Sequence, residues 1–125
     1  MIEILFEGKL ASINNRYNKN FSLTQTYRNC KTELQLAYRL ANVKKTIFTK
    51  PVWVSIEWDK GRMDLDAPIK VILDAMKGEI IKDDKQVERI IVEHCKGMKT
   101  IIRVGELWIV RENRSTSPSL YSGSK

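Results

Sequence analysis

The sequence predicts an α/β (α+β) fold in which a small mixed sheet carries two helices, in the order β-α-β-α-β-β. Several short segments alternate apolar and polar residues, as half-buried strands do, and one long segment repeats its apolar residues about every 3.6 positions, as an amphipathic helix does. At 125 residues, 42% apolar and 30% charged, the chain has the size and composition of one globular domain with a real core.

The first two predicted elements lie on either side of an asparagine-rich loop. Residues 2–6 predict a strand because Ile2, Ile4 and Phe6 alternate with the acidic residues Glu3 and Glu7. A loop follows at residues 12–20. The segment 23–45 then predicts an amphipathic helix, since its apolar or small residues recur on one face. These residues are Leu23, Tyr27, Cys30, Leu34, Ala37, Tyr38 and Ala41.

The later strands are predicted from alternation and from β-branched residues. Val52 to Trp58 alternates after Pro51 and is closed by turn residues at 59–62. Val87 to Cys95 and Lys99 to Val104 predict two strands joined near Gly97. Leu107 to Val110 either continues the last of these or adds a short edge strand.

A second helix is predicted between the second and third strands. It should begin near Asp66 or Ala67, because aspartate is a favourable N-cap and Pro68 then falls in the first turn, where its missing N–H is harmless. It should end by Gly78. Residues 1–110 thus form the predicted domain, and the serine-rich residues 111–125 predict a flexible C-terminal tail.

Composition also limits where the protein works. No apolar run approaches the roughly 20 residues that span a bilayer, and the N-terminus lacks a basic segment followed by a long apolar one. We therefore expect a cytoplasmic protein with no membrane partner. Cys30 and Cys95, the two cysteines, form no CxxC motif and are expected to be reduced.

The net charge of +7 is unevenly distributed along the chain. Residues 9–50 hold nine basic residues and one acidic residue, a balance of +8, whereas the remainder holds 13 basic and 14 acidic residues, a balance of −1. A basic surface of this kind suits contact with a phosphate backbone. The alternative interpretation is a solvated basic helix face.

Clustered carboxylates lie in the chain's second half. Asp64 and Asp66 are followed by Lys70, and a second acidic pair stands at Asp83 and Asp84. Oxygen ligands without histidine or thiolate favour Mg²⁺ or Mn²⁺ over Zn²⁺, and a divalent metal can bridge protein oxygens to phosphate. Lys70, one helical turn beyond Asp66, could stabilise negative charge on phosphate. Alternatively, Asp66 and Lys70 form a surface ion pair and the aspartates cap a helix.

The complete stretch resembles the core motif of the RusA family of Holliday-junction resolvases, which are endonucleases common in phages and prophages. The loop Asn14-Asn15-Arg16-Tyr17 also resembles that family's N-terminal signature. The resemblance covers most of the chain, from Ile4 to about Val104. The matching motifs are Asp64-Leu65-Asp66, Lys70, Leu73-Asp74-Ala75-Met76, Gly78 and Lys82-Asp83-Asp84-Lys85-Gln86-Val87-Glu88.

The resemblance implies a homodimeric α/β nuclease that uses Mg²⁺ to cut paired strands of branched DNA at a four-way junction. It implies that Asp64, Asp66 and Asp84 are the metal-site acids and that Lys70 is a further catalytic residue. The basic N-terminal loop supplies the candidate DNA-binding residues, which are Asn14, Asn15, Arg16 and Lys19.

Two departures from the family pattern concern substrate preference and not catalysis. Ala67 stands where the family usually has asparagine, and Met63 stands where a basic residue is frequent, with Arg62 one place earlier. The role of Asp83 stays open, since adjacent residues in a strand point to opposite faces and a solvated turn residue is the simpler interpretation. The rival hypothesis is a non-catalytic module that binds branched DNA with the same fold.

Overall fold

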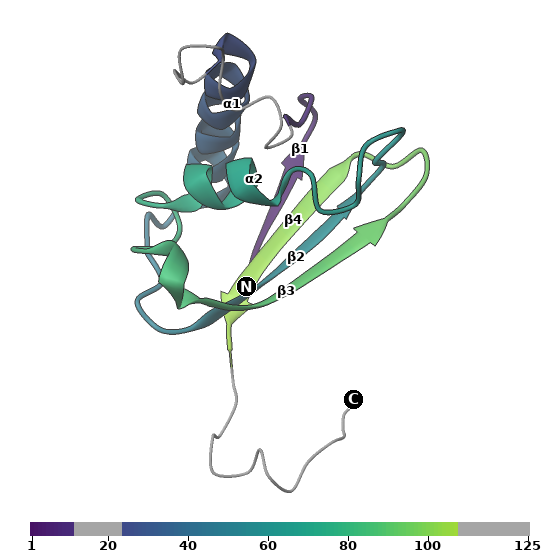
Figure 1. The fold of residues 1–125 in the computed structure, drawn as a ribbon. Helices are drawn as coiled ribbons and strands as arrows, with labels where there is room; N and C mark the ends of the chain where they lie inside the picture. The colour runs from purple at the N-terminus through teal and green to yellow at the C-terminus, as the bar shows by residue number, and fades with distance from the viewer. Residues whose placement is uncertain (12–23, 108–125) are drawn as a thin grey trace, which may run out of the picture.

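The computed structural model describes residues 1–11 and 24–107. It has a mixed four-stranded sheet and two α-helices, so the predicted α+β fold and the order β-α-β-α-β-β are confirmed, with one additional 3₁₀ turn (Figure 1). The elements are β1 (Ile2–Phe6), α1 (Gln25–Ala41), β2 (Val52–Trp58), α2 (Ile69–Met76), the 3₁₀ turn η2 (Asp84–Gln86), β3 (Val87–His94) and β4 (Thr100–Glu106).

The strands are ordered β1-β4-β2-β3 across the sheet, so the last described strand lies between the first two. β4 is antiparallel to both of its neighbours, and β3 runs parallel to β2. The ends of β1, β2 and β3 and the start of β4 therefore meet at one end of the sheet. We call it the acidic-turn end, because the turn at residues 64–68, which carries Asp64 and Asp66, follows β2. β3 forms an outer edge of the sheet (Figure 1).

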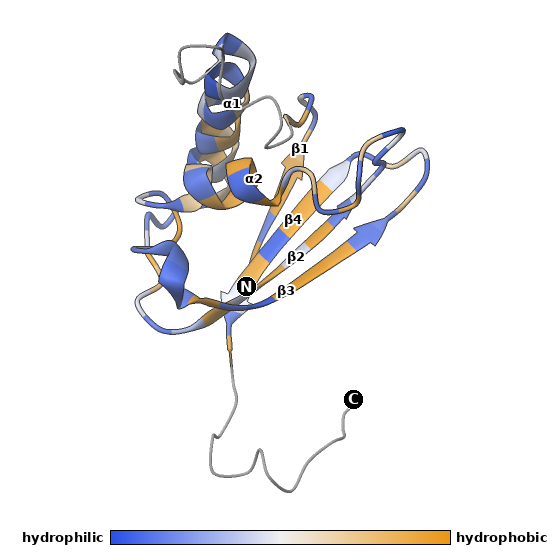
Figure 2. Cartoon of the chain, in the orientation of Figure 1, coloured by the Kyte–Doolittle hydropathy of each residue, from blue (hydrophilic) through white to orange (hydrophobic). Residues whose placement is uncertain are grey.

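The core lies between one face of the sheet and the two helices. Val52, Val54, Ile56 and Trp58 alternate on β2 and are all buried, as their period of two requires. α1 contributes its predicted apolar stripe, and the hydrophobic residues along the strands and inner helix faces are visible in Figure 2. The buried residues of that stripe are Tyr27, Cys30, Leu34 and Tyr38.

A hydrogen bond joins the two helices, and another caps the start of α1. The Tyr38 hydroxyl donates to the backbone oxygen of Ile72 over 2.9 Å, which satisfies a polar group inside the α1–α2 interface. The Thr24 hydroxyl accepts from the backbone N–H of Tyr27 and caps α1. α1 is therefore shorter than the predicted 23–45 helix and begins at a capping threonine.

The predicted start of α2 at Asp66 or Ala67 is wrong. The helix begins at Ile69, Pro68 occupies the N-cap position, and no side chain caps it. A proline disfavours helical backbone in the residue before it, so the helix does not extend back through Ala67. Residues 64–68 form a turn instead. In it, the backbone N–H of Ala67 donates to the backbone oxygen of Asp64 over 3.1 Å, and the backbone N–H of Ile69 donates to the backbone oxygen of Asp66 over 3.2 Å.

Asp59 joins two connections at the acidic-turn end of the sheet. Its carboxylate oxygens accept from the backbone N–H of Gly61 over 3.0 Å and of Gly97 over 2.9 Å. These bonds, first that from Gly97 and then that from Gly61, lower the pKa of Asp59 below its usual value of 3.8. The connection between β3 and β4 passes the end of β2 here. Asp59 therefore joins this connection, at Gly97, to the turn that follows β2, at Gly61.

Some sequence predictions fall outside the described residues. The asparagine-rich loop and the tail are among them, as is most of the segment 107–110, of which the structure describes only Leu107, whose N–H donates to Pro51 oxygen over 2.9 Å. Cys30 and Cys95 are both unpaired, as expected for reduced thiols. None of the described helices is long and apolar enough to cross a membrane.

Replacing Asp59 by Asn should destabilise the protein at neutral pH and not in acid. Because the folded-state pKa is lowered, the charged carboxylate stabilises the fold above about pH 3.8, and this contribution is lost as pH falls through the lower folded-state pKa. Chemical denaturation should show a lower midpoint for Asp59→Asn than for the wild type at pH 7, with the gap closing below pH 3.8. An equal gap at both pH values would contradict this role; Glu106→Gln is the control.

Candidate active site

The two carboxylates of Asp64 and Asp66 lie exposed on the turn at residues 64–68, called here the acidic turn. The buried Trp58 ends β2, and its ring N–H donates to the backbone oxygen of Leu65 over 3.3 Å. The indole thus fixes the residue between the two aspartates to the end of the sheet. Neither aspartate caps α2, so the interpretation of both as helix caps is not supported.

Lys70 lies in the first turn of α2 and is paired with Asp74, a residue of the family motif for which the sequence predicted no role. The ammonium is 2.9 Å from Asp74 Oδ1, at the i,i+4 spacing of a helical ion pair. The Tyr27 hydroxyl of α1 donates to Asp74 Oδ2. The Asp74 side chain is only 18% exposed, so it holds Lys70 more rigidly than a fully solvated partner would. The spacing of four residues was the available signal.

The two members of the second acidic pair have different roles in the turn that holds them. Asp83 is the N-cap of η2: its Oδ1 accepts from the N–H of Lys85 over 3.0 Å. That bond, followed by one with the Asp84 side chain, lowers the pKa of Asp83. Asp84 is half-exposed and is the first residue of η2. Asp83 therefore serves the backbone, in agreement with the simpler interpretation of a turn residue.

Gln86 anchors this 3₁₀ turn to the segment before β2. Its side-chain oxygen accepts from the N–H groups of Lys82 and Asp83, both over 2.8 Å. Its side-chain nitrogen donates to the oxygens of Phe48 and Lys50 over 2.8 and 3.0 Å. Asp84 is consequently presented from a fixed turn.

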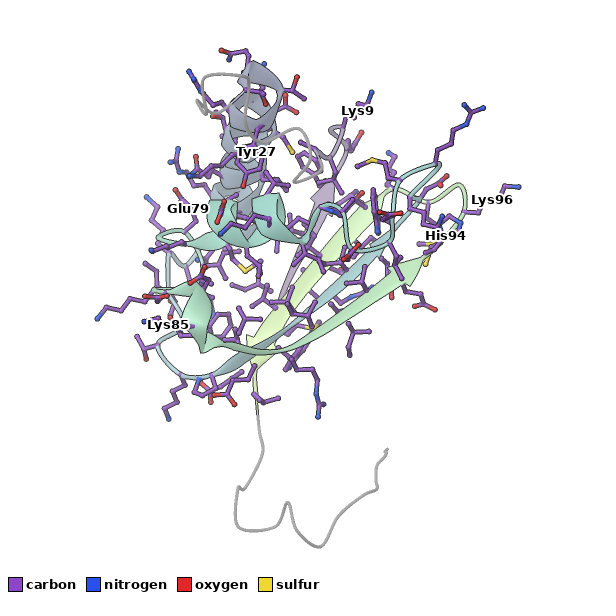
Figure 3. All side chains as sticks on the ribbon, viewed as in Figure 1. Lys9, Tyr27, Glu79, Lys85, His94 and Lys96 are labelled. Carbon is purple, nitrogen blue, oxygen red and sulfur yellow. The ribbon has the colours of Figure 1, made fainter. Side chains whose placement is uncertain are left out.

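The acidic turn and Asp84 lie towards opposite ends of the parallel strand pair. Val52 pairs with Val87 at the start of β2 and β3, and Trp58 pairs with His94 at their end. Six residue steps along a strand span about 20 Å. In Figure 3, Lys85 marks one end of β3 and His94 the other. Within residues 1–11 and 24–107, no three His, Cys, Asp or Glu side chains gather closely enough to hold a metal ion.

A groove of about 500 Å³ opens at the acidic-turn end of the sheet. Trp58 and Met63, the residue before Asp64, are among its lining residues. We call it the sheet-end groove. Its charged lining residues are Glu7, Lys9, Asp59, Lys60, Arg62 and Lys99.

Some charged side chains of the sheet-end groove have partners and others form no ion pair with another described residue. Glu7 lies 3.5 Å from Lys99, and Asp59 is engaged with backbone N–H groups. Lys9, Lys60 and Arg62 form no ion pair with another residue that the structure describes. The groove therefore carries a surplus of cations directly beside the acidic turn. Sequence reasoning missed Lys60 and Lys99 because their position at the sheet end depends on the strand order.

The predicted DNA-binding residues Asn14, Asn15, Arg16 and Lys19 lie outside the described residues. Of the remaining basic residues between 9 and 50, Lys9 lines the sheet-end groove. Arg39 is bound to Glu79 through a contact of 2.8 Å. The basic segment is therefore not one uniform surface.

The donor set of the acidic turn fits a hard divalent cation. Asp64 and Asp66 offer two exposed carboxylates separated by one residue. Mg²⁺ is commonly bound by one or two carboxylates together with waters and substrate phosphates, so two protein ligands are sufficient for it. The nearby cations of the groove are ammonium and guanidinium groups, which do not act as metal ligands.

Comparison with protein families identifies the chain's relatives. The family model described as endodeoxyribonuclease RusA matches residues 9–105. A search of curated proteins found no match. The matched region includes the acidic turn, Lys70, Asp84 and most of the sheet. Because the match covers most of the chain, the protein belongs to the RusA family of endodeoxyribonucleases.

Proposed function

We propose that the protein is a Mg²⁺-dependent endonuclease that cuts four-way DNA junctions, with the acidic turn as the centre of its active site. The observation that carries this proposal is the position of two exposed carboxylates, Asp64 and Asp66, beside a groove with surplus cations at the same end of the sheet. Family membership supports the reaction type.

The charge arrangement suits a polyanionic substrate. Lys9, Lys60 and Arg62 would bind backbone phosphates in the sheet-end groove and bring the neighbouring phosphodiester to the acidic turn. Exposed carboxylates alone would repel that phosphate. A divalent cation between them removes the repulsion, which is why an acidic site inside a basic surface is consistent with metal-dependent phosphodiester hydrolysis.

The residues of the acidic turn and α2 would share the chemistry. Asp64 and Asp66 would hold Mg²⁺, with Mn²⁺ as a substitute, and the bound cation supplies positive charge to the reacting phosphate and the departing 3′-oxygen. Lys70 would donate to a phosphate oxygen and stabilise its growing charge. Asp74 would keep the ammonium in place, since it holds Lys70 at 2.9 Å.

A homodimer would suit this substrate. A four-way junction presents two symmetry-related strands, and a two-fold dimer presents two active sites. A non-catalytic junction-binding module is the alternative, and a wild-type protein that binds junctions without cutting them in Mg²⁺ or Mn²⁺ would establish it.

Asp64→Asn and Asp66→Asn should each abolish cleavage and leave junction binding intact or tighter. Each substitution keeps the side-chain size but removes a negative charge that a hard cation needs, and less negative charge favours DNA. The measurement is single-turnover cleavage of a synthetic four-way junction across a Mg²⁺ titration, with binding measured in Ca²⁺. Glu33→Gln, an exposed substitution on α1, is the control. Substantial cutting by Asp66→Asn at saturating Mg²⁺ would exclude it as a metal ligand.

Asp74→Asn should slow cleavage only while Lys70 is present. If Asp74 acts by positioning the ammonium, the single substitutions Lys70→Met and Asp74→Asn should each reduce the single-turnover rate at least about tenfold, and the double substitution should be no worse than Lys70→Met. Junction affinity in Ca²⁺ and the unfolding midpoint are measured in parallel. Independent, multiplicative losses would show that Asp74 acts through the fold and not through Lys70.

Removing Lys60 and Arg62 together should weaken the salt dependence of DNA binding. Each backbone phosphate that the protein no longer neutralises should reduce the slope of log K against log salt by about 0.9. Lys44→Ala with Lys50→Ala is the matched control, because both are exposed lysines outside the sheet-end groove. An unchanged slope in Lys60→Ala/Arg62→Ala would place the DNA path elsewhere.

A further inference from the structure

The outward side of α1 carries a line of exposed apolar side chains. Leu36, Leu40 and Val43 succeed one another at intervals of four and three residues, which is the spacing of one helix face. Their exposed fractions are 55%, 71% and 79%. The buried residues of α1 lie on the opposite side of the helix, towards the core. α1 therefore has a second apolar face, which no other described part of the chain covers.

A hollow of about 430 Å³ lies where this line ends, between the end of α1 and the segment after α2. Ile47, which is 40% exposed, is the large apolar residue of its lining. Arg39 and Asn42 also line the hollow and are the sequence neighbours of Leu40 and Val43. The line from Leu36 to Val43 and the hollow are called here the outer-helix surface. The lining residues of the hollow are Arg39, Asn42, Lys45, Ile47, Gly78 and Glu79.

The walls of the hollow are held together by Asn42 and Arg39. The side-chain nitrogen of the buried Asn42 donates to the backbone oxygen of Thr46 over 2.9 Å and to the backbone oxygen of Glu79 over 3.1 Å. Arg39 donates to the carboxylate of Glu79, which is labelled in Figure 3, over 2.8 Å. The turn after α1 is thus joined to the segment after α2. A preformed surface loses little conformational entropy when a partner binds, which favours affinity.

Cations lie beside the outer-helix surface without acidic partners. Lys44 and Lys45 directly follow Val43 and are exposed, and neither forms an ion pair with another residue in the ranges 1–11 and 24–107. The charge of Arg39, by contrast, is offset by Glu79. The surface therefore combines apolar contact area with positive charge, which attracts an acidic partner and repels a basic one.

This combination disfavours two occupants that the chain itself could supply. A second copy docked on the same surface would bring its own Lys44 and Lys45 close to those of the first, and like charges across an interface are unfavourable. Residues 108–125 contain three basic residues and one acidic residue, so their net charge has the same sign as the surface. The occupant is therefore expected to be a different protein.

Nucleic acid and lipid also match this surface less well. Contacts with backbone phosphates use cations and hydrogen-bond donors, and they gain nothing from a line of exposed leucines. Helices that lie in a bilayer surface carry a wide apolar face in which aromatic residues are frequent. The line on α1 is narrow, contains no aromatic residue and ends in a hollow, which a protruding side chain can fill.

We propose that the outer-helix surface binds an acidic amphipathic helix of another protein. The apolar side of that helix packs along Leu36, Leu40 and Val43, and one of its apolar side chains enters the hollow, as in other interfaces where a helix is held by anchors at helical spacing. Its acidic residues face Lys44 and Lys45. The outer-helix surface shares no lining residue with the sheet-end groove, so the proposal does not rest on the proposed nuclease function.

The chemistry of the surface is tested with two synthetic helical peptides of equal length. Both carry leucines at helical spacing on one side, and the flanking positions are all glutamate in one peptide and all lysine in the other. In a fluorescence anisotropy titration with the full chain, the glutamate peptide should bind at least about tenfold more tightly than the lysine peptide. Equal affinities, or no saturable binding of the glutamate peptide, would overturn the proposal.

The position of the site is tested with exposed substitutions. Leu40→Ser/Val43→Ser and Lys44→Glu/Lys45→Glu should each raise the dissociation constant of the glutamate peptide at least about tenfold, with the unfolding midpoint unchanged because all four side chains are exposed. The matched controls are Leu5→Ser, an exposed leucine on β1, and Lys60→Ala/Arg62→Ala in the sheet-end groove. Full binding by Leu40→Ser/Val43→Ser, or its loss in the groove variant, would overturn the assignment.

The other occupants give distinct results with the same variants. Self-association of the wild type that Leu40→Ser/Val43→Ser removes would assign the surface to a second copy. Binding to phosphatidylserine vesicles that the same substitutions abolish would assign it to a membrane, and a parallel loss of junction binding would assign it to DNA. A gain of peptide affinity in Leu120→Ser/Tyr121→Ser would show that residues 108–125 occupy it. Each of these four results would overturn the proposal.

Discussion

The buried indole of Trp58 is the contact on which the candidate site depends. Its ring N–H holds the acidic turn through Leu65, and its backbone oxygen accepts from Cys95. The same residue therefore fixes the segment after β2 and the segment after β3. Asp59, the next residue, adds bonds to Gly61 and Gly97. A regular, buried strand end thus positions an exposed, irregular loop, as is common where a rigid scaffold presents functional residues.

The acidic residues of the motif have different structural roles, which their residue type alone does not distinguish. Asp83 and Asp74 are engaged with partners inside the fold, and Asp84 is half-exposed beside Asp83, whereas Asp64 and Asp66 leave their carboxylates exposed. A site that must change its ligands during a reaction needs acids of the second kind. The first kind supplies rigidity: Asp83 closes a turn, and Asp74 joins α1 to α2 through Tyr27.

Most of the elements were predictable because their patterns are local. The alternation in Val52–Trp58 and the stripe on α1 follow from burial of one face, and both are observed. The start of α2 was misjudged because the favourable cap chemistry of Asp66 competed with the restriction that Pro68 imposes on Ala67. Strand order could not be predicted, since nothing local says that β4 pairs with β1 and β2. The sheet-end groove and the distance from Asp84 to the acidic turn depend on that order, so neither was foreseeable from the residues alone.

The central position of β4 also orders the events of folding. Among the strands that the structure describes, β1 pairs only with β4, and the register Ile2 to Val104 joins residues from opposite ends of the described chain. During synthesis, β1 and the inner side of β2 must wait without a strand partner until residues 100–106 have left the ribosome. Closing so long a loop is slow, because its entropic cost precedes the contacts that offset it. The helices α1 and α2 can pack against each other earlier. We expect them to cover the apolar faces of β1 and β2 until β4 inserts between these two strands.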